Sequence, residues 1–117
     1  MGFLSHSLAA SLSKSPTFKS IVLPGDDYVP SHQLYPSDSI SAYHAADSEY
    51  ASPDAWAEYV LEKCKSYTEC GTSASFSAVE DGKQYWYGFI FRGGAVDASA
   101  FEEKPDASGA RAFIIKA

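Results

Sequence analysis

The sequence predicts an α+β fold in which one main helix packs on a small antiparallel β-sheet. The first observation behind this prediction is helical periodicity in residues 52–66, SPDAWAEYVLEKCKS. The second is a pair of strand-like stretches, Thr72–Glu80 and Lys83–Arg92, joined by Asp81-Gly82. The third is size, because 117 residues of which 45% are hydrophobic suit one packed domain, predicted at residues 17–117.

The charge pattern argues against several classes of function. The formal net charge is -6, and the nine Lys and Arg residues are scattered along the chain. We therefore expect neither phosphate contacts to nucleic acid nor docking on an anionic membrane. No apolar run approaches the roughly 20 residues that a membrane-spanning helix needs. The Ser-rich residues 1–16, predicted to be a flexible segment, match a secretory signal poorly because no basic residue precedes their apolar part, and localisation stays open.

The helix prediction rests on how the helix begins and on its apolar stripe. Ser52 can cap the helix, Pro53 suits its first turn, and Asp54 faces the positive end of the helix dipole. The apolar side chains that recur at helical spacing on one side are Trp56, Tyr59, Val60 and Cys64. This stripe is expected to pack on the sheet.

The hairpin prediction rests on Asp81-Gly82, which suits a two-residue type I′ turn because both positions need positive φ. Such a turn pairs Glu80 with Lys83 and sets the register of every pair beyond them. One face of the hairpin then carries aromatic side chains and two alanines. This face is expected to be buried beneath the helix, and its aromatic residues are Phe76, Tyr85, Tyr87, Phe89 and Phe91.

The opposite face of the hairpin is the predicted binding surface. A glycine leaves a gap between Trp86 and Ile90, and the residues facing it are small serines. Such a trough suits the stacking of a sugar or a proline ring, so the expected ligand is a carbohydrate or a protein. The alternative is that a loop or the N-terminal segment covers this face. The predicted ligand-binding residues are Ser73, Ser75, Ser77, Trp86, Gly88 and Ile90.

The remaining elements are less regular in sequence. We expect a strand at residues 18–23, an irregular segment at 24–52 broken by short strands or a helical turn around 38–46, a helical turn at 97–101 and a closing strand at 112–116. Pro24-Gly25 marks the end of the first strand. Ile114 and Ile115 suggest that the C-terminal end is tied into the sheet.

The two cysteines, Cys64 and Cys70, are six positions apart, which is not the spacing of a redox CxxC motif. No nearby histidine completes a zinc site, so neither a metal nor a cofactor is expected. Three interpretations stay open: a local disulfide, two buried thiols, or a nucleophile. The disulfide is favoured, and closing a loop of about seven residues would contribute roughly 2 to 2.5 kcal/mol.

A longer stretch, residues 57–94, carries a resemblance to a known family. AEYVLEKCKSYTECGTSASFSAVEDGKQYWYGFIFRGG, followed by DASAF, resembles the PAN/apple-like domain, as in small fungal fruit-body-specific proteins. The resemblance implies a PAN/apple-like form of the α+β fold and an extracellular, non-catalytic module that binds proteins or carbohydrates. Family members usually carry one further cysteine where this chain has Val60, and another in the second strand. Their absence leaves Cys64 and Cys70 only each other as partners.

Two other classes of function remain as alternatives. A small enzyme could act on an apolar metabolite in an aromatic-lined pocket, with proton transfer by Tyr85, Tyr87, Asp27 or His44. The sequence contains no Gly-rich phosphate loop, no GxSxG elbow and no HExxH zinc motif. The other alternative is a structural or effector-type protein that acts by contacting another protein.

Overall fold

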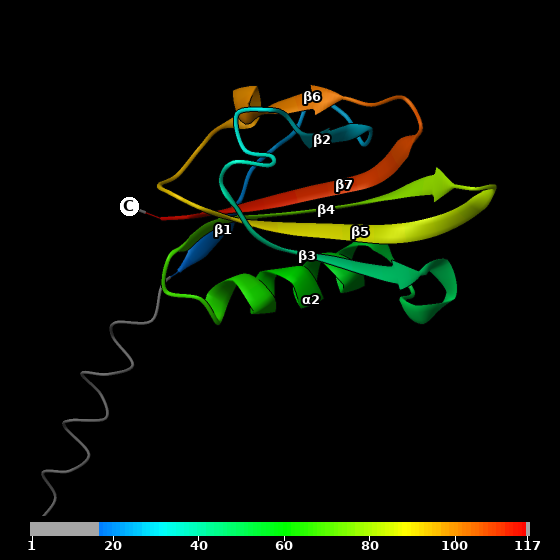
Figure 1. Cartoon of the computed structure of the whole chain (residues 1–117), viewed down its shortest axis with the longest axis horizontal. Helices are drawn as coiled ribbons and strands as arrows, with labels where there is room; N and C mark the ends of the chain where they lie inside the picture. The colour runs from blue at the N-terminus through cyan, green and yellow to red at the C-terminus, as the bar shows by residue number, and fades with distance from the viewer. Residues whose placement is uncertain (1–16, 117) are drawn as a thin grey trace, which may run out of the picture.

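The central sheet is antiparallel, and its strands lie in the order β1 (Phe18–Ser20), β7 (Ala107–Ile115), β4 (Cys70–Glu80), β5 (Lys83–Arg92) and β3 (Ser39–Ala46) (Figure 1). The computed structural model describes residues 17–116, so the expected flexible segment at residues 1–16 lies outside the described residues. A two-stranded sheet pairs β2 (Tyr28–Pro30) with β6 (Phe101–Glu103). Together with the helix α2 (Pro53–Lys65), these elements make an α+β fold, as the sequence predicts.

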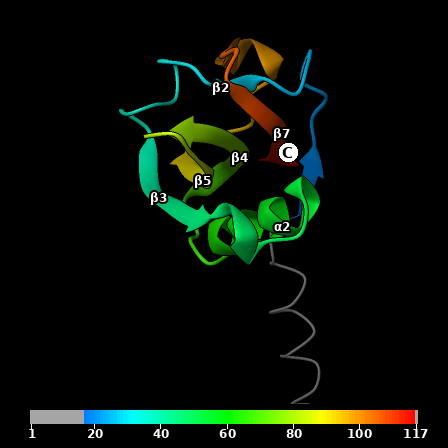
Figure 2. The same ribbon diagram turned by 90° about the vertical axis from the view of Figure 1, so that its right-hand side faces the viewer.

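The elements form three layers, with the central sheet in the middle. Figures 1 and 2 show α2 against one face of this sheet and the small β2–β6 sheet against the other. Two short 3₁₀ helices lie in the connections: η1 (Asp47–Glu49) between β3 and α2, and η2 (Ala98–Ala100) between β5 and β6.

Helix α2 begins as its sequence predicts, and three of the four residues of its predicted apolar stripe are buried. Ser52 is the N-cap, and its Oγ accepts a hydrogen bond from the Ala55 N–H at 3.1 Å. Pro53 occupies the first turn, where a missing N–H costs nothing. The buried residues of α2 repeat at helical spacing. Trp56, Val60 and Cys64 of the predicted stripe are among them, whereas Tyr59 is only half-buried and Ala57 and Leu61 are buried in addition.

The β4–β5 hairpin has the predicted turn and register. Asp81 and Gly82 have φ values of 53° and 78°, as a type I′ turn requires. Glu80 pairs with Lys83, and the pairs Ala78–Tyr85, Phe76–Tyr87, Ser77–Trp86, Ser75–Gly88 and Ser73–Ile90 follow. Local turn chemistry therefore decides which side chains share a face.

The face that α2 covers is the reverse of the prediction. The helix packs on the face with Trp86, Gly88 and Ile90, and the Trp56 Nε1–H donates to the Tyr87 carbonyl at 2.9 Å. At Gly88 the helix lies so close to β5 that a Cβ atom on this residue would collide with the Val60 side chain. The expected exposed trough therefore does not exist over most of its length; the gap at Gly88 accommodates the helix.

The aromatic face, expected beneath the helix, is covered instead by the β2–β6 layer and the segments beside it. Phe91 is fully buried there, and Phe76 is 7% exposed. The residues that pack over this face include Leu23, Tyr28, Val29, Leu34 and Phe101. The segment predicted to be irregular thus supplies a second hydrophobic layer.

Other elements differ from the predictions mainly in length. The first strand ends at Ser20 rather than near residue 23, and the closing strand is longer than 112–116, since β7 begins at Ala107. The uncertain stretch at residues 38–46 forms strand β3, which pairs with β5. The expected turn near residues 97–101 is η2, where the Asp97 side chain accepts from the Ser99 N–H at 2.9 Å.

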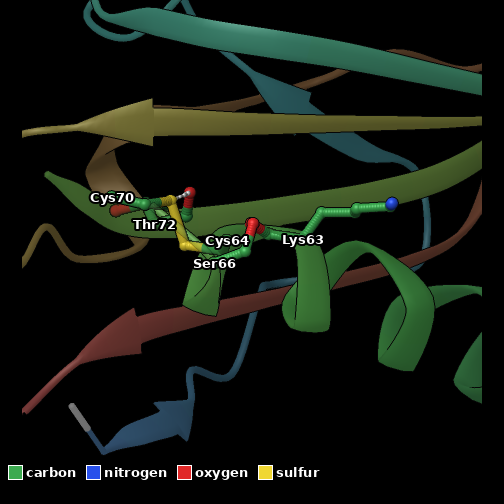
Figure 3. The surroundings of a disulfide bond; sticks show 5 residues. All are labelled: Lys63, Cys64, Ser66, Cys70 and Thr72. Carbon is green, nitrogen blue, oxygen red and sulfur yellow. Dashed lines mark hydrogen bonds between the residues drawn. A yellow bond between two sulfur atoms is a disulfide. The ribbon is translucent and has the colours of Figure 1, made fainter. Parts of the chain in front are cut away.

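Cys64 and Cys70 form a disulfide, which confirms the favoured interpretation of this pair. The bond joins the last turn of α2 to the first residue of β4 (Figure 3), with an S–S distance of 2.07 Å. Both residues belong to the core between helix and sheet. The disulfide therefore fixes the C-terminal end of the helix to the face on which the helix packs.

The two ends of the described chain lie next to each other. The Lys116 N–H donates to the Thr17 carbonyl at 2.9 Å, which continues the pairing between β1 and β7. Because β7 runs antiparallel to β4, its C-terminal end lies beside Thr72 and Ser73, far along the strand from the turn at Asp81 and Gly82.

Candidate ligand-binding cleft

An open cleft of about 600 Å³ lies at the turn end of the sheet, beyond the first residues of α2. Its floor is the continuation of the face that the helix covers. The residues that line it are Asp26, Asp47, Pro53, Ser77, Gln84, Trp86, Ser108, Gly109 and Arg111. Its volume lies within the 300–1,000 Å³ that is typical of ligand sites.

A β-bulge in β7 brings two polar side chains to this cleft. Ser77 pairs with Ser108 and Ser75 pairs with Arg111, so two residues of β7 lie opposite one residue of β4. The first of the two is Gly109, whose φ of 63° is the left-handed conformation that such a bulge requires. In a regular strand Ser108 and Arg111, three positions apart, would point to opposite faces, and the extra residue of the bulge brings both side chains to the same face.

Gly109 also sets one wall of the cleft. A Cβ atom at this position would lie 2.9 Å from the Pro53 Cγ, closer than such atoms approach. The start of α2 therefore rests against the bulge. The same glycine thus permits the bulge conformation and the close contact with the helix.

Arg111 is the cationic group of the cleft. Its Nε–H donates to Asp54 Oδ1 at 2.8 Å, and its Nη1 donates to the Ala110 carbonyl at 3.0 Å and lies 3.8 Å from Asp26 Oδ1. Both carboxylates are about four-fifths exposed, so these ion pairs add little to stability. They do orient the guanidinium. Its Nη2 donates to no group among residues 17–116.

The floor of the cleft combines an indole edge with small polar groups. Trp86 is only 5% exposed, and its Nε1–H donates to the Asp47 carbonyl at 3.0 Å. The Gln84 amide donates to the Ser77 hydroxyl. These bonds give the polar groups of the floor their partners, and none of the buried side-chain polar atoms that the structure describes lacks a partner.

The predicted binding residues therefore divide into two groups. Ser77 and Trp86 line the cleft. The other four, Ser73, Ser75, Gly88 and Ile90, are buried on the sheet face that carries α2 and do not line it. The sequence prediction missed the cleft residues that come from β7 and those that come from the segments before β2 and around the start of α2. A glycine within a strand-like stretch, Gly109, was the available sign of a bulge and of a close backbone approach.

The aromatic face brings together three of the four residues considered for proton transfer. His44 of β3 stacks on Tyr85 with ring centroids 4.9 Å apart and lies 5.4 Å from the Tyr87 ring. Asp27 lies before β2, where its carbonyl accepts from the Lys104 N–H. The hollows on this face measure about 230 and 150 Å³, below the usual range for ligand sites.

The titration of Tyr87 tests whether its phenol lies on the aromatic face as described. Burial raises the pKa of its phenol to about 12, and the hydrogen bond between the phenol and Glu80 acts in the same direction. Because the folded-state pKa is raised, the resulting stabilisation is present below pH 10 and is lost as the pH rises through about 12. We expect ultraviolet titration to show a late tyrosine step that disappears in Tyr87→Phe and shifts to lower pH in Glu80→Gln. A titration left unchanged by Tyr87→Phe would contradict this assignment.

Comparison of the chain with protein-family models, with curated proteins and with solved structures returns no match. Among residues 17–116, no group of three or more His, Cys, Asp or Glu side chains could hold a metal ion. Within the same residues, no helix has the length and apolar character that crossing a membrane requires.

Proposed function

We propose that the protein is a non-catalytic binding module that takes a neutral carbohydrate in the cleft at the turn end of the sheet. The observation that carries this proposal is the lining of the cleft. Hydrogen-bond donors and acceptors from Arg111, Gln84, Ser108 and Asp26 surround the indole edge of Trp86. Sugar hydroxyls both donate and accept, so a mixed lining of this kind suits them better than a purely apolar ligand.

The charges around the cleft support a neutral ligand over an anionic one. Arg111 is the one basic residue of the lining, and it already lies between the carboxylates of Asp26 and Asp54. Asp47 adds a third acidic residue at the rim. An anion would meet this local excess of negative charge and the net charge of -6 of the whole chain. The resemblance to PAN/apple-like domains, which implies binding of carbohydrates or proteins, agrees with the proposal.

The enzyme alternative has weaker support. A phenol whose pKa is about 12 stays protonated at neutral pH and is a poor match for a general base there. His44 is exposed and stacks on tyrosine rings rather than lying beside a carboxylate in a closed pocket. A hydrogen-bond-lined cleft of suitable volume therefore favours binding over proton transfer.

A glycan array, followed by calorimetry with the glycan that binds best, tests the proposal. We expect Arg111→Gln to weaken binding by about tenfold to about a hundredfold, because a hydrogen bond from a charged donor contributes about 1.5–3 kcal/mol. Arg92→Gln is the matched control, since this exposed arginine is at the other end of β5. Its affinity should stay within about twofold of the wild-type value.

Two results would contradict the proposal. The first is the absence of any glycan bound by the wild-type protein at millimolar concentration. The second is equal loss of affinity in Arg111→Gln and Arg92→Gln, which would place the ligand away from the cleft. Trp86→Ala is not a suitable test, because Trp86 belongs to the core beneath α2 and its removal would disturb the fold.

A further inference from the structure

The two edges of the central sheet are protected very differently. At one edge, β1 has three residues, one of which is Lys19, and both shortness and lysine discourage pairing with another strand. At the other edge, β3 has eight residues, Ser39–Ala46, and contains no proline, lysine or carboxylate. An edge of this length without such protection can pair with a further strand.

The hairpin register shows which backbone groups of β3 are free. In a hairpin with a two-residue turn, Glu80–Lys83 exchanges both backbone hydrogen bonds, and every second pair along the strands does the same. The odd-numbered residues of β5 therefore bond to β4, and the even-numbered residues bond to β3. The Arg92 N–H, which donates to the Asp38 carbonyl at 2.9 Å, follows this rule.

The residues of β3 divide accordingly. Tyr43 and Ala45 pair with Gly88 and Trp86 and direct their N–H and C=O groups to β5. The backbone groups of Ala42 and His44 point away from the sheet. No backbone bond from either residue to a strand other than β5 occurs among residues 17–116.

We propose that β3 is a homodimer interface, in which the β3 strands of two copies pair in antiparallel fashion about a two-fold axis near Tyr43. In this register Ala42 of each copy faces His44 of the other, and each facing pair exchanges both backbone hydrogen bonds. All the outward groups of these two residues then have partners. A second copy is the occupant that this strand fits, because the register is self-complementary and places Ala42 opposite His44, while Tyr43, whose ring contacts Tyr59 of the helix, faces its own counterpart.

The surroundings of the strand suit this arrangement. Neither Ala42 nor His44 would face its own counterpart, so two imidazole rings are not forced together. Asp47 of one copy would lie near Ser39 of the other, whose carbonyl accepts from the Arg92 guanidinium at 3.4 Å. The acidic η1 turn of one copy therefore approaches the basic end of β5 in the other copy.

Sedimentation equilibrium of the full chain, from about 10 μM to about 1 mM at about 0.15 M salt, tests the dimer. We expect a monomer–dimer equilibrium that Ala42→Lys weakens by at least about tenfold, because an edge lysine blocks strand pairing. The matched control is Val22→Lys, which adds the same charge at a side chain that is 91% exposed. It should leave the dimer constant within about twofold.

Amide hydrogen exchange locates the contact without any substitution. The Ala42 and His44 amides should exchange quickly in dilute protein and slowly in concentrated protein. The Tyr43 amide, directed to β5, should be slow in both and is the internal control. A chain that stays monomeric at the highest concentration, or a dimer in which the Ala42 and His44 amides remain unprotected, would overturn the proposal.

Discussion

Replacing Trp56 with alanine should lower the free energy of unfolding by about 3–5 kcal/mol, which is the cost of truncating a buried tryptophan. Trp56 is 1% exposed and lies between the helix and the sheet, where its ring stacks on Tyr59 and packs near Trp86. Its Nε1–H also donates to the Tyr87 carbonyl. Because the total stability of a domain is about 5–15 kcal/mol, this single change removes a large share of it.

Urea denaturation followed by circular dichroism measures this loss. Tyr67→Ala is the control, since Tyr67 follows the same helix but is 38% exposed. Its effect should be near 0.5 kcal/mol, as is usual for a surface substitution. Equal effects of the two changes would show that α2 does not cover the sheet as described.

Gly88→Ala should destabilise the protein by about 1–3 kcal/mol, because it adds a methyl group to a closed interface. The added Cβ would collide with Val60 Cγ2 and lie 3.2 Å from Val60 Cγ1 and 3.3 Å from Trp56 Cζ2. The helix would have to move away from β5. This experiment distinguishes the two faces of the sheet, since alanine would be tolerated at position 88 if the helix lay on the aromatic face.

Gly94→Ala is the matched control for this substitution. A Cβ atom there meets nothing within 4 Å, and the backbone of Gly94 does not have a positive φ. We expect its midpoint of thermal unfolding to stay near the wild-type value, whereas that of Gly88→Ala should fall by several degrees. A Gly88→Ala protein as stable as wild type would contradict the helix placement.

The sequence predicted those features that depend on neighbouring residues. Asp81-Gly82 determined the hairpin turn, and the register of β4 and β5 followed from it. Ser52 and Pro53 likewise marked the start of α2. These predictions succeeded because turn and cap chemistry acts over a few residues and needs no knowledge of the rest of the chain.

The sequence did not predict which face the helix would cover, because both faces of the hairpin carry large apolar side chains. The aromatic face looked like the more hydrophobic core, yet Trp86, Ile90 and the gap at Gly88 match the shape of the α2 stripe better. Steric fit between distant segments decided the outcome. Hydrophobic alternation alone carries no information about such fit.

The candidate cleft was predicted only in part for the same reason. Ser77 and Trp86 belong to the hairpin, whose register was known, whereas Arg111 and Ser108 reach the cleft through the bulge at Gly109. Asp26 and Asp47 come from segments that had no regular pattern. Their positions depend on the packing of β2, β6 and η1, which the sequence does not reveal locally.

The hydrogen bond from Lys116 to Thr17 places residues 17 and 116 side by side. Residues 17 and 116 both lie at one end of the sheet, and the cleft opens near the other end, by Gln84 and Ser108. A unit cut to residues 17–116 would therefore have adjacent ends, which suit insertion into a loop of a host protein with little strain. A host joined at residues 17 and 116 would hold the domain with the candidate cleft on the side away from the attachment.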